Sequence, residues 1–206
     1  MIDLYLDLET VAIDDAADYV EPVSAPANYK DESKIAAYIA EKRAEKIAKA
    51  ALDPDLCRIV ALGLDDGQTD PTVTICRTEE AEALALGDLA VVLNAGTHRI
   101  ITFNGFRFDL PVLMRRAQYL GVELPEISLD KYRSPHVDLY QRLTFNGAID
   151  GHSLRFYARR FRIPCEDTFI GADVAKLVAE GYWAEVEAHC LSDLKLTLAL
   201  AAKVLR

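Results

Sequence analysis

The chain has 206 residues, of which 51% are hydrophobic and 27% charged, a composition that is typical of a folded domain and excludes a disordered chain. Its 33 acidic and 23 basic residues give a net charge of −10, which argues against a nucleic-acid partner because phosphates are bound largely by Lys and Arg. No stretch approaches the roughly 20 apolar residues of a membrane span, and acids stand near the N-terminus where a signal peptide is basic, so we expect a cytoplasmic protein.

The first part of the chain predicts one strand and one long helix. Residues 2–8 alternate apolar and polar side chains, as a strand does. After a polar stretch, residues 31–52 are rich in alanine, with Lys and Glu at helical spacing, and Asp53-Pro54 ends this helix. Its simplest interpretation is a solvated amphipathic helix. We expect residues 14–55 to form a helical insertion between the first two strands.

The remainder alternates strands and helices and then ends in helices. The pattern predicts strands at 58–64, 72–76 and 99–103, and helices at 79–93, 109–120, 153–161, 172–180 and 183–205. This order predicts one α/β domain over residues 1–206, with a mixed sheet flanked by helices. Its first three strands are expected to be antiparallel and its later strands to be added in parallel. The four cysteines are scattered, so we expect reduced thiols and no zinc site.

Acidic side chains stand at the ends of several predicted elements. Asp7 and Glu9 are two residues apart on the first strand, so their side chains point to one face. Asp109 stands at the start of a helix, where it can also act as an N-cap. His189 and Asp193 lie one turn apart on the last helix. Taken singly, each is explained as well by a solvated acid pair, a helix cap or a surface His–Asp pair.

Aromatic side chains surround the acid at position 109. The segment from Phe103 to Asp109 passes through an Asn-Gly turn and includes Phe106 and Phe108. Aromatic rings beside an acid indicate a platform on which nucleic-acid bases stack. Membership of the hydrophobic core explains the same two rings equally well.

Carboxylates brought together without cations would raise one another's pKa, because like charges repel. Carboxylate oxygens are hard ligands that suit Mg²⁺ or Mn²⁺. Two such ions about 3.5–4 Å apart can stabilise the attacking and leaving oxygens of a phosphodiester. If the four acids converge, the sequence predicts a site for two divalent cations, Mg²⁺ or Mn²⁺, and phosphodiester hydrolysis.

Three segments in this order resemble the three motifs of the DEDD superfamily of 3′–5′ exonucleases: Asp7-Leu8-Glu9-Thr10, residues 104–111, and residues 189–193. The chain is most similar to the predicted 3′–5′ exonucleases related to the proofreading domain of family-B DNA polymerases in bacteria and phages. Residues 136–139 and Ser153-Leu154 also resemble that subfamily. The resemblance implies a ribonuclease-H-like fold, two divalent cations, release of 5′-mononucleotides from the 3′ end of single-stranded DNA, and a place in DNA repair or proofreading.

The same resemblance implies roles for particular residues. Asp7 would bridge both metals, Glu9 and Asp193 would complete the site of the nucleophilic water, and Asp109 would hold the second metal directly or through water. The residues expected to contact the substrate are Thr10, Asn104, Gly105, Phe106, Phe108, Arg155 and Arg159.

One position departs from the pattern of the superfamily. One branch carries Tyr four residues before its final Asp, and the other carries His five residues before it. Here His189 stands at the Tyr spacing, and Ala188 stands at the His spacing. Because imidazole can act as a general base near neutrality, we expect His189 to contact the nucleophilic water.

Local charge modifies the argument from net charge. Residues 153–165 contain four arginines and no acid, and residues 28–52 contain six basic and four acidic side chains. These stretches are either solvated faces or a path for a single strand. Together with metal-neutralised acids, they predict weak, metal-dependent and salt-sensitive DNA binding. A 3′–5′ exoribonuclease and a catalytically inactive nucleic-acid-binding module of the same fold remain alternatives.

Overall fold

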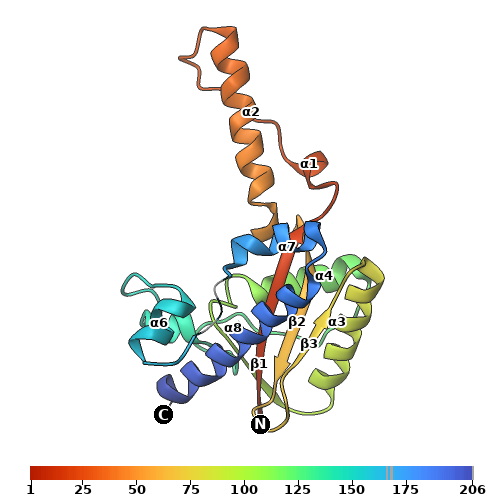
Figure 1. The fold of residues 1–206 in the computed structure, drawn as a ribbon, viewed down its shortest axis with the longest axis vertical. Helices are drawn as coiled ribbons and strands as arrows, with labels where there is room; N and C mark the ends of the chain where they lie inside the picture. The colour runs from red at the N-terminus through yellow and green to blue at the C-terminus, as the bar shows by residue number, and fades with distance from the viewer. Residues whose placement is uncertain (166, 168, 206) are drawn as a thin grey trace.

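The computed structural model describes residues 1–165, 167 and 169–205 and builds a five-stranded mixed sheet with helices on both faces (Figure 1). The strands are β1 (Ile2–Ala12), β2 (Cys57–Asp65), β3 (Thr72–Ile75), β4 (His98–Thr102) and β5 (Val137–Asp138), in the spatial order β3-β2-β1-β4-β5. β1 and β2 pair antiparallel, as do β2 and β3, whereas β4 runs parallel to β1 and β5 parallel to β4. The mixed sheet predicted from the sequence is confirmed, and the first strand lies at its centre.

The helices form two layers around this sheet. They are α1 (Ala16–Tyr19), α2 (Glu32–Ala48), α3 (Glu79–Asn94), α4 (Asp109–Leu120), α5 (Leu139–Leu143), α6 (Leu154–Arg160), α7 (Val174–Glu180) and α8 (Trp183–Val204), with 3-10 turns η1 (Ala50–Leu52) and η2 (Gly171–Asp173). α3 and α4 cover one face, and α8 covers the other with α5, α6 and α7 beside it. Among the described residues, no helix has both the length and the apolar character that crossing a membrane requires.

The alternation along β1 decides which face receives the acids. Leu4, Leu6 and Leu8 are buried in the cluster beneath α3 and α4. Tyr5 and Val11 belong to the clusters on the α8 side. Because side chains alternate along a strand, the odd-numbered residues 7 and 9 point toward α8. The two-residue spacing thus directs both carboxylates to the layer that carries the last motif.

Tertiary pairing changes several predicted boundaries. β1 continues to Ala12, beyond the predicted end at residue 8, because β2 pairs with it as far as Ala12↔Cys57. The register shifts between Glu9 and Thr10, where β2 holds an extra residue, so the strand bends at a β-bulge. The helix predicted at 31–52 ends at Ala48 and is followed by η1. Two short helices, α1 and α5, were not predicted.

A buried ion pair joins α3 to α4 beside this bulge. Arg116 is 3% exposed and Glu82 is fully buried, and their Nε and Oε1 atoms lie 2.7 Å apart. The Glu82 carboxylate also accepts a hydrogen bond from the backbone N–H of Ile59 at 2.9 Å. Ile59 pairs with Thr10 immediately after the register shift. The pair therefore supports the sheet where β1 carries Glu9.

α2 projects from the body of the molecule as an arm (Figure 1). All of its residues are described, and none is buried. Asp31 caps its start by accepting hydrogen bonds from the backbone N–H groups of Ser33 and Lys34. The base of the arm is η1, where Ala50 is buried and the Thr10 hydroxyl donates to the carbonyl of Ala51 at 2.6 Å. The arm thus joins the body at the end of β1 that follows Glu9.

Candidate active site

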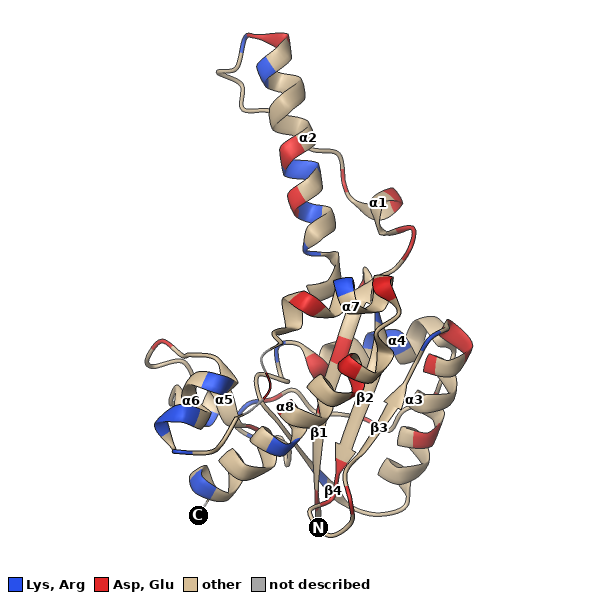
Figure 2. Cartoon of the chain, in the orientation of Figure 1, with Lys and Arg blue, Asp and Glu red and all other residues tan. Residues whose placement is uncertain are grey.

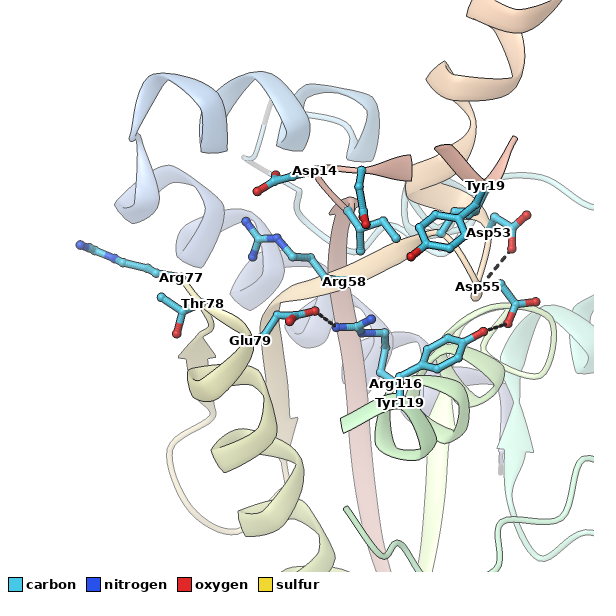
Figure 3. Close-up of a pocket in the computed structure, with 13 residues that line it drawn as sticks. Asp14, Tyr19, Asp53, Asp55, Arg58, Arg77, Thr78, Glu79, Arg116 and Tyr119 are labelled. Atoms are coloured by element: carbon cyan, nitrogen blue, oxygen red, sulfur yellow. Dashed lines mark hydrogen bonds and ion pairs between the residues drawn. The ribbon is translucent and has the colours of Figure 1, made fainter. Parts of the chain in front are cut away.

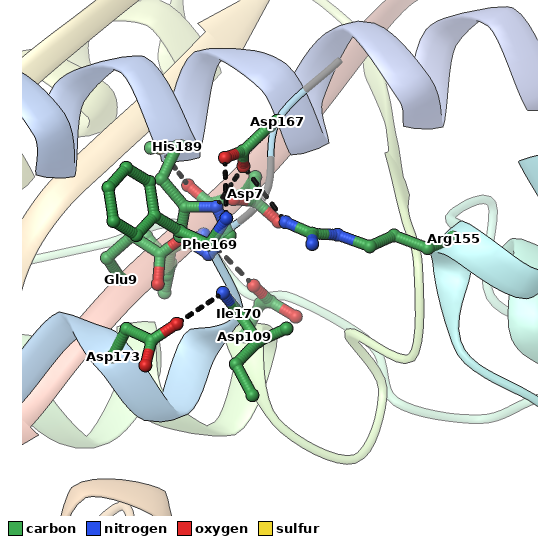
Figure 4. A network of polar contacts seen from close by, with 11 residues as sticks. Asp7, Glu9, Asp109, Arg155, Asp167, Phe169, Ile170, Asp173 and His189 are labelled. Atoms are coloured by element: carbon green, nitrogen blue, oxygen red, sulfur yellow. Dashed lines mark hydrogen bonds and ion pairs between the residues drawn. The ribbon is translucent and has the colours of Figure 1, made fainter. Parts of the chain in front are cut away.

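The site begins where β4 leaves β1. Their pairing ends at Tyr5↔Ile101, so the next backbone groups on that side of β1 have no β4 partner in the register. The N–H of Leu8 instead donates to Oδ1 of Asp109 at 3.2 Å. This bond ties the start of α4 to β1 between Asp7 and Glu9 (Figure 4).

The turn before α4 is shaped by a carboxylate from β5. Asn104 has a φ of +63°, in the left-handed region, and its N–H donates to Asp138 at 2.8 Å. The N–H of Phe106 donates to the second oxygen of Asp138 at 3.2 Å. A Cβ at Gly105 would collide with the side chain of Thr102, so the close approach of this turn requires glycine. Asp138 thereby fixes the turn that delivers the first residue of α4.

α8 approaches β1 closely at the same place. A Cβ at Gly63 of β2 would lie 2.9 Å from Sγ of Cys190, so glycine is needed there for α8 to pack this tightly. The Cys190 thiol donates a long hydrogen bond to the carbonyl of Asp7 at 3.9 Å. His189 is 2% exposed, and its Nε2 lies 3.4 Å from Oε1 of Glu9. The last motif therefore contacts the first on the face of the sheet that α8 covers.

A residue that the sequence analysis did not select completes the polar network. Asp167 precedes η2, and its Oδ2 lies 2.6 Å from Nδ1 of His189 and 3.0 Å from a terminal nitrogen of Arg155 (Figure 4). Ligand atoms of Asp167, His189 and Asp193 all lie within 4.8 Å of one another. No local pattern marks Asp167 in the sequence, because its partner His189 lies on a different element.

Burial is the main cause that raises the pKa values of the four acids, and neighbouring carboxylates add to the rise. For Asp7 the main cause is burial, followed by the charges of Glu9, Asp109 and Asp193. Burial also raises the pKa of Glu9, with Asp193 and Asp109 adding to it. Burial raises the pKa of Asp109 to about 7, and burial raises that of Asp193. The four carboxyls therefore resist full ionisation when no cation is bound.

This group fits divalent cations. Oδ2 of Asp7 and Oδ1 of Asp193 are buried and have no hydrogen-bond partner among the described residues. A buried carboxylate oxygen without a donor is costly unless a cation or water occupies the space beside it. Carboxylate oxygens are the ligands that Mg²⁺ and Mn²⁺ prefer. The donor set thus suits hard cations, whose charge would relieve the repulsion within the group.

The other predicted contact residues are placed differently. Thr10 is 8% exposed and binds the base of the arm through its hydroxyl. Phe106 is 9% exposed and belongs to the main core, the second of the two positions that the sequence allows for it. Phe108 packs against that core and is only partly buried. Arg155 reaches the network through Asp167, whereas Arg159 is exposed on α6 and makes no contact with the acids among the described residues.

A separate pocket lies beside the base of the arm. It has a volume of about 880 Å³, and its lining includes Tyr19, Arg58, Arg77, Arg116 and Tyr119 (Figure 3). None of the four grouped acids lines it. The pocket is therefore distinct from the candidate metal centre.

Comparison with known proteins agrees with this geometry. The family model of predicted 3′–5′ exonucleases related to the exonuclease domain of PolB matches residues 52–204. The match includes the second and third motifs and begins after the arm, so the strand carrying Asp7 and Glu9 lies outside it. No curated protein matches the chain.

Solved structures extend the likeness to the whole fold. The family B DNA polymerase of the hyperthermophilic archaeon Pyrobaculum calidifontis superposes with a TM-score of 0.65 and 20% identity, covering 98% of this chain and 24% of that one. The chain thus spans about a quarter of the polymerase that it matches. A chain of the ExoI/SSB-Ct complex is more distant, with a TM-score of 0.42 and 15% identity, covering 93% of this chain and 42% of that one.

Proposed function

Because the chain belongs to the family of predicted 3′–5′ exonucleases related to the exonuclease domain of PolB, we propose that it hydrolyses single-stranded DNA from the 3′ end. The products are 5′-mononucleotides, and the cofactors are two divalent cations, Mg²⁺ or Mn²⁺. One observation carries this proposal: buried Glu9 and Asp109 lie with partly buried Asp7 and Asp193 in one group of raised pKa, in which two buried carboxylate oxygens have no hydrogen-bond donor among the described residues.

The four carboxylates would hold the cations. Bound ions there would supply neutralisation of phosphodiester charge and a lowered pKa of a water molecule, as in other two-metal sites. The residues of this chain supply the arrangement around them. The bond from Leu8 to Asp109 fixes the start of α4 against β1, and the Gly63 contact sets the depth of α8.

We assign His189 the role of accepting a proton from the nucleophilic water. With Nδ1–H donated to Asp167, the neutral imidazole keeps its lone pair at Nε2, on the side of Glu9. Asp167 fixes this tautomer and the orientation of the ring, as a carboxylate does for other catalytic histidines. Arg155 in turn holds Asp167. The Tyr-type spacing of His189 is thus compatible with a general base.

The terminal nucleotide has several contacts in this proposal. Asn104 and Gly105 lie in the turn that precedes α4, and Phe108 contributes the partly exposed ring beside it. Arg155 offsets part of the burial-driven rise in the pKa of both Glu9 and Asp193, so its charge acts at the site. Its guanidinium is suited to a phosphate near the scissile bond.

The decisive experiment is digestion of 3′- and 5′-labelled single-stranded DNA, duplex DNA and RNA with Mg²⁺ or Mn²⁺. Wild type is compared with Asp7→Asn, purified in parallel to exclude a contaminating nuclease. A stepwise ladder from the 3′ end of single-stranded DNA, absent in the variant, is expected. Digestion of RNA alone would mean that the substrate is RNA and not single-stranded DNA. Activity that is equal in both proteins, or absent on every substrate, would overturn the proposal.

A further inference from the structure

α6 and its flanks carry a dense group of arginines on a molecule that is acidic overall. Residues 142–162 contain five arginines and a single acid, Asp150, whereas the whole chain has a net charge of −10. In Figure 2 the charged residues of α6 are all basic, while those of α3 are all acidic. Of the two acids that follow this segment, Asp167 is already held in the polar network of the site, and Glu166 lies outside the described residues. This part of the chain therefore forms a local basic surface.

Three of these arginines form a row that begins at the candidate active site. Arg155 lies in the first turn of α6, and a terminal nitrogen of its guanidinium lies 3.0 Å from Oδ2 of Asp167 (Figure 4). Arg159 stands four residues later, so it lies on the same face of the helix about 6 Å further along the axis. Arg162 follows the last residue of the helix by two positions. We call Arg155, Arg159 and Arg162 the arginine row, which extends from the acids along α6.

The two outer members of the arginine row have no countercharge within the described chain. Arg159 and Arg162 are both exposed, and the ion pairs and cation–π contacts among the described residues include neither of them. Arg162 has a φ of +59°, at the position after a helix that glycine usually occupies. A bulky residue in the left-handed region is strained, and such strain is found at binding sites. Both guanidinium groups are therefore available to an anion outside the chain.

Aromatic rings lie beside the arginine row on the outer surface of α6. Phe156 is 40% exposed, and the exposed ring of His152 stacks on it with centroids 3.9 Å apart. The opposite face of the helix is buried and consists of Leu154, Tyr157 and Ala158. Guanidinium groups that follow a backbone, together with rings on which bases stack, are the combination by which proteins hold single-stranded nucleic acid.

The place where the arginine row begins favours the substrate strand over a protein partner. Arg155 reaches His189 through Asp167, so the row starts inside the network that surrounds the acids. A strand whose 3′ end lies at those acids has to continue across an acidic molecule, which repels phosphates. The basic face of α6 provides the charge that such a strand needs. A protein partner would give no reason for the row to begin within the catalytic network.

We propose that the arginine row binds the phosphates that precede the 3′-terminal nucleotide of the substrate strand, and that the His152–Phe156 pair stacks on one of its bases. This inference rests on the proposed exonuclease function, because it extends a strand whose 3′ end lies at the metal centre. Arg155 contacts the phosphate at the site, and Arg159 and Arg162 contact the phosphates beyond it, through the paired donors of each guanidinium. Such contacts do not read sequence, since every strand has the same phosphates and every base has a π face. The surface therefore selects single strands of any sequence.

The test measures DNA binding without hydrolysis. Arg159→Gln/Arg162→Gln is placed in an Asp7→Asn background, and fluorescence anisotropy is read with a single strand of about 16 nucleotides, the upper range of such binding sites. Each phosphate contact contributes about 0.7 to the salt slope of single-strand binding. Losing two contacts should therefore lower the slope by about 1.4 and weaken binding about 25-fold at roughly 0.1 M salt.

The stacking contact is tested in the same background. Phe156→Ala should weaken binding about 5- to 150-fold, the range for one stacked base, and should leave the salt slope unchanged because no phosphate contact is lost. Phe156→Tyr keeps a ring of the same kind and should bind like the parent. Thermal unfolding of each variant identifies any loss of binding that comes from a loss of folding.

A charge-matched control is Arg43→Gln/Arg77→Gln, two exposed arginines on α2 and before α3, which should leave the affinity and the salt slope unchanged. The inference would be overturned by unchanged binding in Arg159→Gln/Arg162→Gln, by an equal loss in the control pair, or by an equal loss in Phe156→Tyr and Phe156→Ala. Unchanged binding in the first variant would leave an acidic protein as the partner of this surface.

The two proposals fail separately. Binding that depends on the arginine row, in a protein whose wild type hydrolyses nothing, would contradict the exonuclease assignment alone. A wild type that produces the 3′ ladder, with strand binding that is insensitive to Arg159→Gln/Arg162→Gln, would contradict only the role of the arginine row.

Discussion

At Asp109, folding favours the protonated form of the carboxyl, whereas metal binding requires the ionised form. The group is 6% exposed, and burial together with the nearby charge of Asp138 raises its pKa to about 7. The hydrogen bond from Leu8 favours the ionised form, but it does not outweigh burial. A cation binds the ionised form. In the metal-free site a buried ionised carboxylate is unfavourable, and cation binding removes this cost.

This conflict predicts how the stability of the metal-free protein depends on pH. The folded-state pKa of Asp109 lies above its usual value of 3.8, so the folded protein retains a proton that the unfolded chain releases. The contribution of this carboxyl to stability is therefore fully present below about pH 4 and is lost as pH rises toward 7. Asp109→Asn should make the fall in stability with pH less steep and stabilise the metal-free protein at pH 8 by on the order of 2–4 kcal/mol.

Urea unfolding in EDTA at pH 5 and pH 8 measures the effect. Asp88→Asn, an exposed acid on α3, is the control and should behave like wild type at both values. A fall in stability that is as steep in Asp109→Asn as in wild type would contradict the assignment of the strain to this carboxyl.

The His189 assignment predicts distinct effects for two neighbouring substitutions. His189→Gln should lower the single-turnover rate about 10²- to 10⁴-fold across the pH–rate profile, because general-base catalysis is lost. Asp167→Asn should lower the rate about 10- to 100-fold while His189 remains, since it removes only the group that orients the ring. Metal affinity is measured alongside by calorimetry. Arg160→Gln, exposed on α6, is the control, and an unchanged rate and profile in His189→Gln would contradict the assignment.

At the scale of elements, the local pattern predicted the longer strands and helices, whereas tertiary contacts determined their boundaries. The alternation in residues 2–8 was sufficient for β1, but its continuation to Ala12 depends on pairing with β2. The short helix α5 follows from Asp138, which caps it by accepting from the N–H groups of Tyr140 and Gln141. That residue was identified only as part of a motif, because its bonds to the turn at Asn104 join distant segments.

The same distinction holds within the site. Asp7, Glu9 and Asp109 could be selected because each stands near the boundary of a predicted element within a motif, and Asp193 because it lies one turn from His189 in the last motif. Asp167 could not be selected, because only its contact with His189, 22 residues away on α8, marks it as part of the site. The core position of Phe106 was equally open in the sequence, because an aromatic residue fits a stacking platform and a core alike.

The buried pair of α3 and α4 makes a prediction about these elements. Glu82→Gln leaves the buried guanidinium of Arg116 with only the exposed carboxylate of Glu79 as a countercharge and should cost about 3–5 kcal/mol of unfolding free energy. Glu79→Gln, at the 60% exposed partner of the same arginine, should cost less than about 1 kcal/mol. Urea denaturation compares the two. Similar small losses in both variants would mean that Arg116 does not depend on the buried partner.

At the scale of the whole molecule, the net charge of −10 does not prevent DNA binding but determines the conditions under which it occurs. Without cations, the four grouped acids repel the phosphate that the site must accept. When cations are bound, their positive charge attracts the phosphate to the same acids. The long-range repulsion from the rest of the acidic surface remains and is countered only at local basic regions.

Metal should therefore strengthen DNA binding as well as support hydrolysis. A single strand with a phosphorothioate 3′ end, which slows cleavage, should bind at least about tenfold more tightly in Mg²⁺ than in EDTA at matched ionic strength. Its affinity should fall steeply as KCl rises. Anisotropy titrations measure both effects, with Asp7→Asn as the variant in which the gain from Mg²⁺ shrinks. Equal affinity in Mg²⁺ and EDTA would contradict a metal-neutralised site.

The absence of buried residues in α2, all of which are described, separates the arm from the cooperative core. Its backbone amides should exchange hydrogen by local opening, orders of magnitude faster than those in the buried half of α8. Glu82→Gln should then accelerate exchange in α8 and leave α2 unchanged, a pattern that mass spectrometry resolves by peptide. A global melting temperature consequently does not report on the stability of the arm. Its length and charge are therefore free to diverge, under selection or in engineering, at no cost to the stability of the catalytic body.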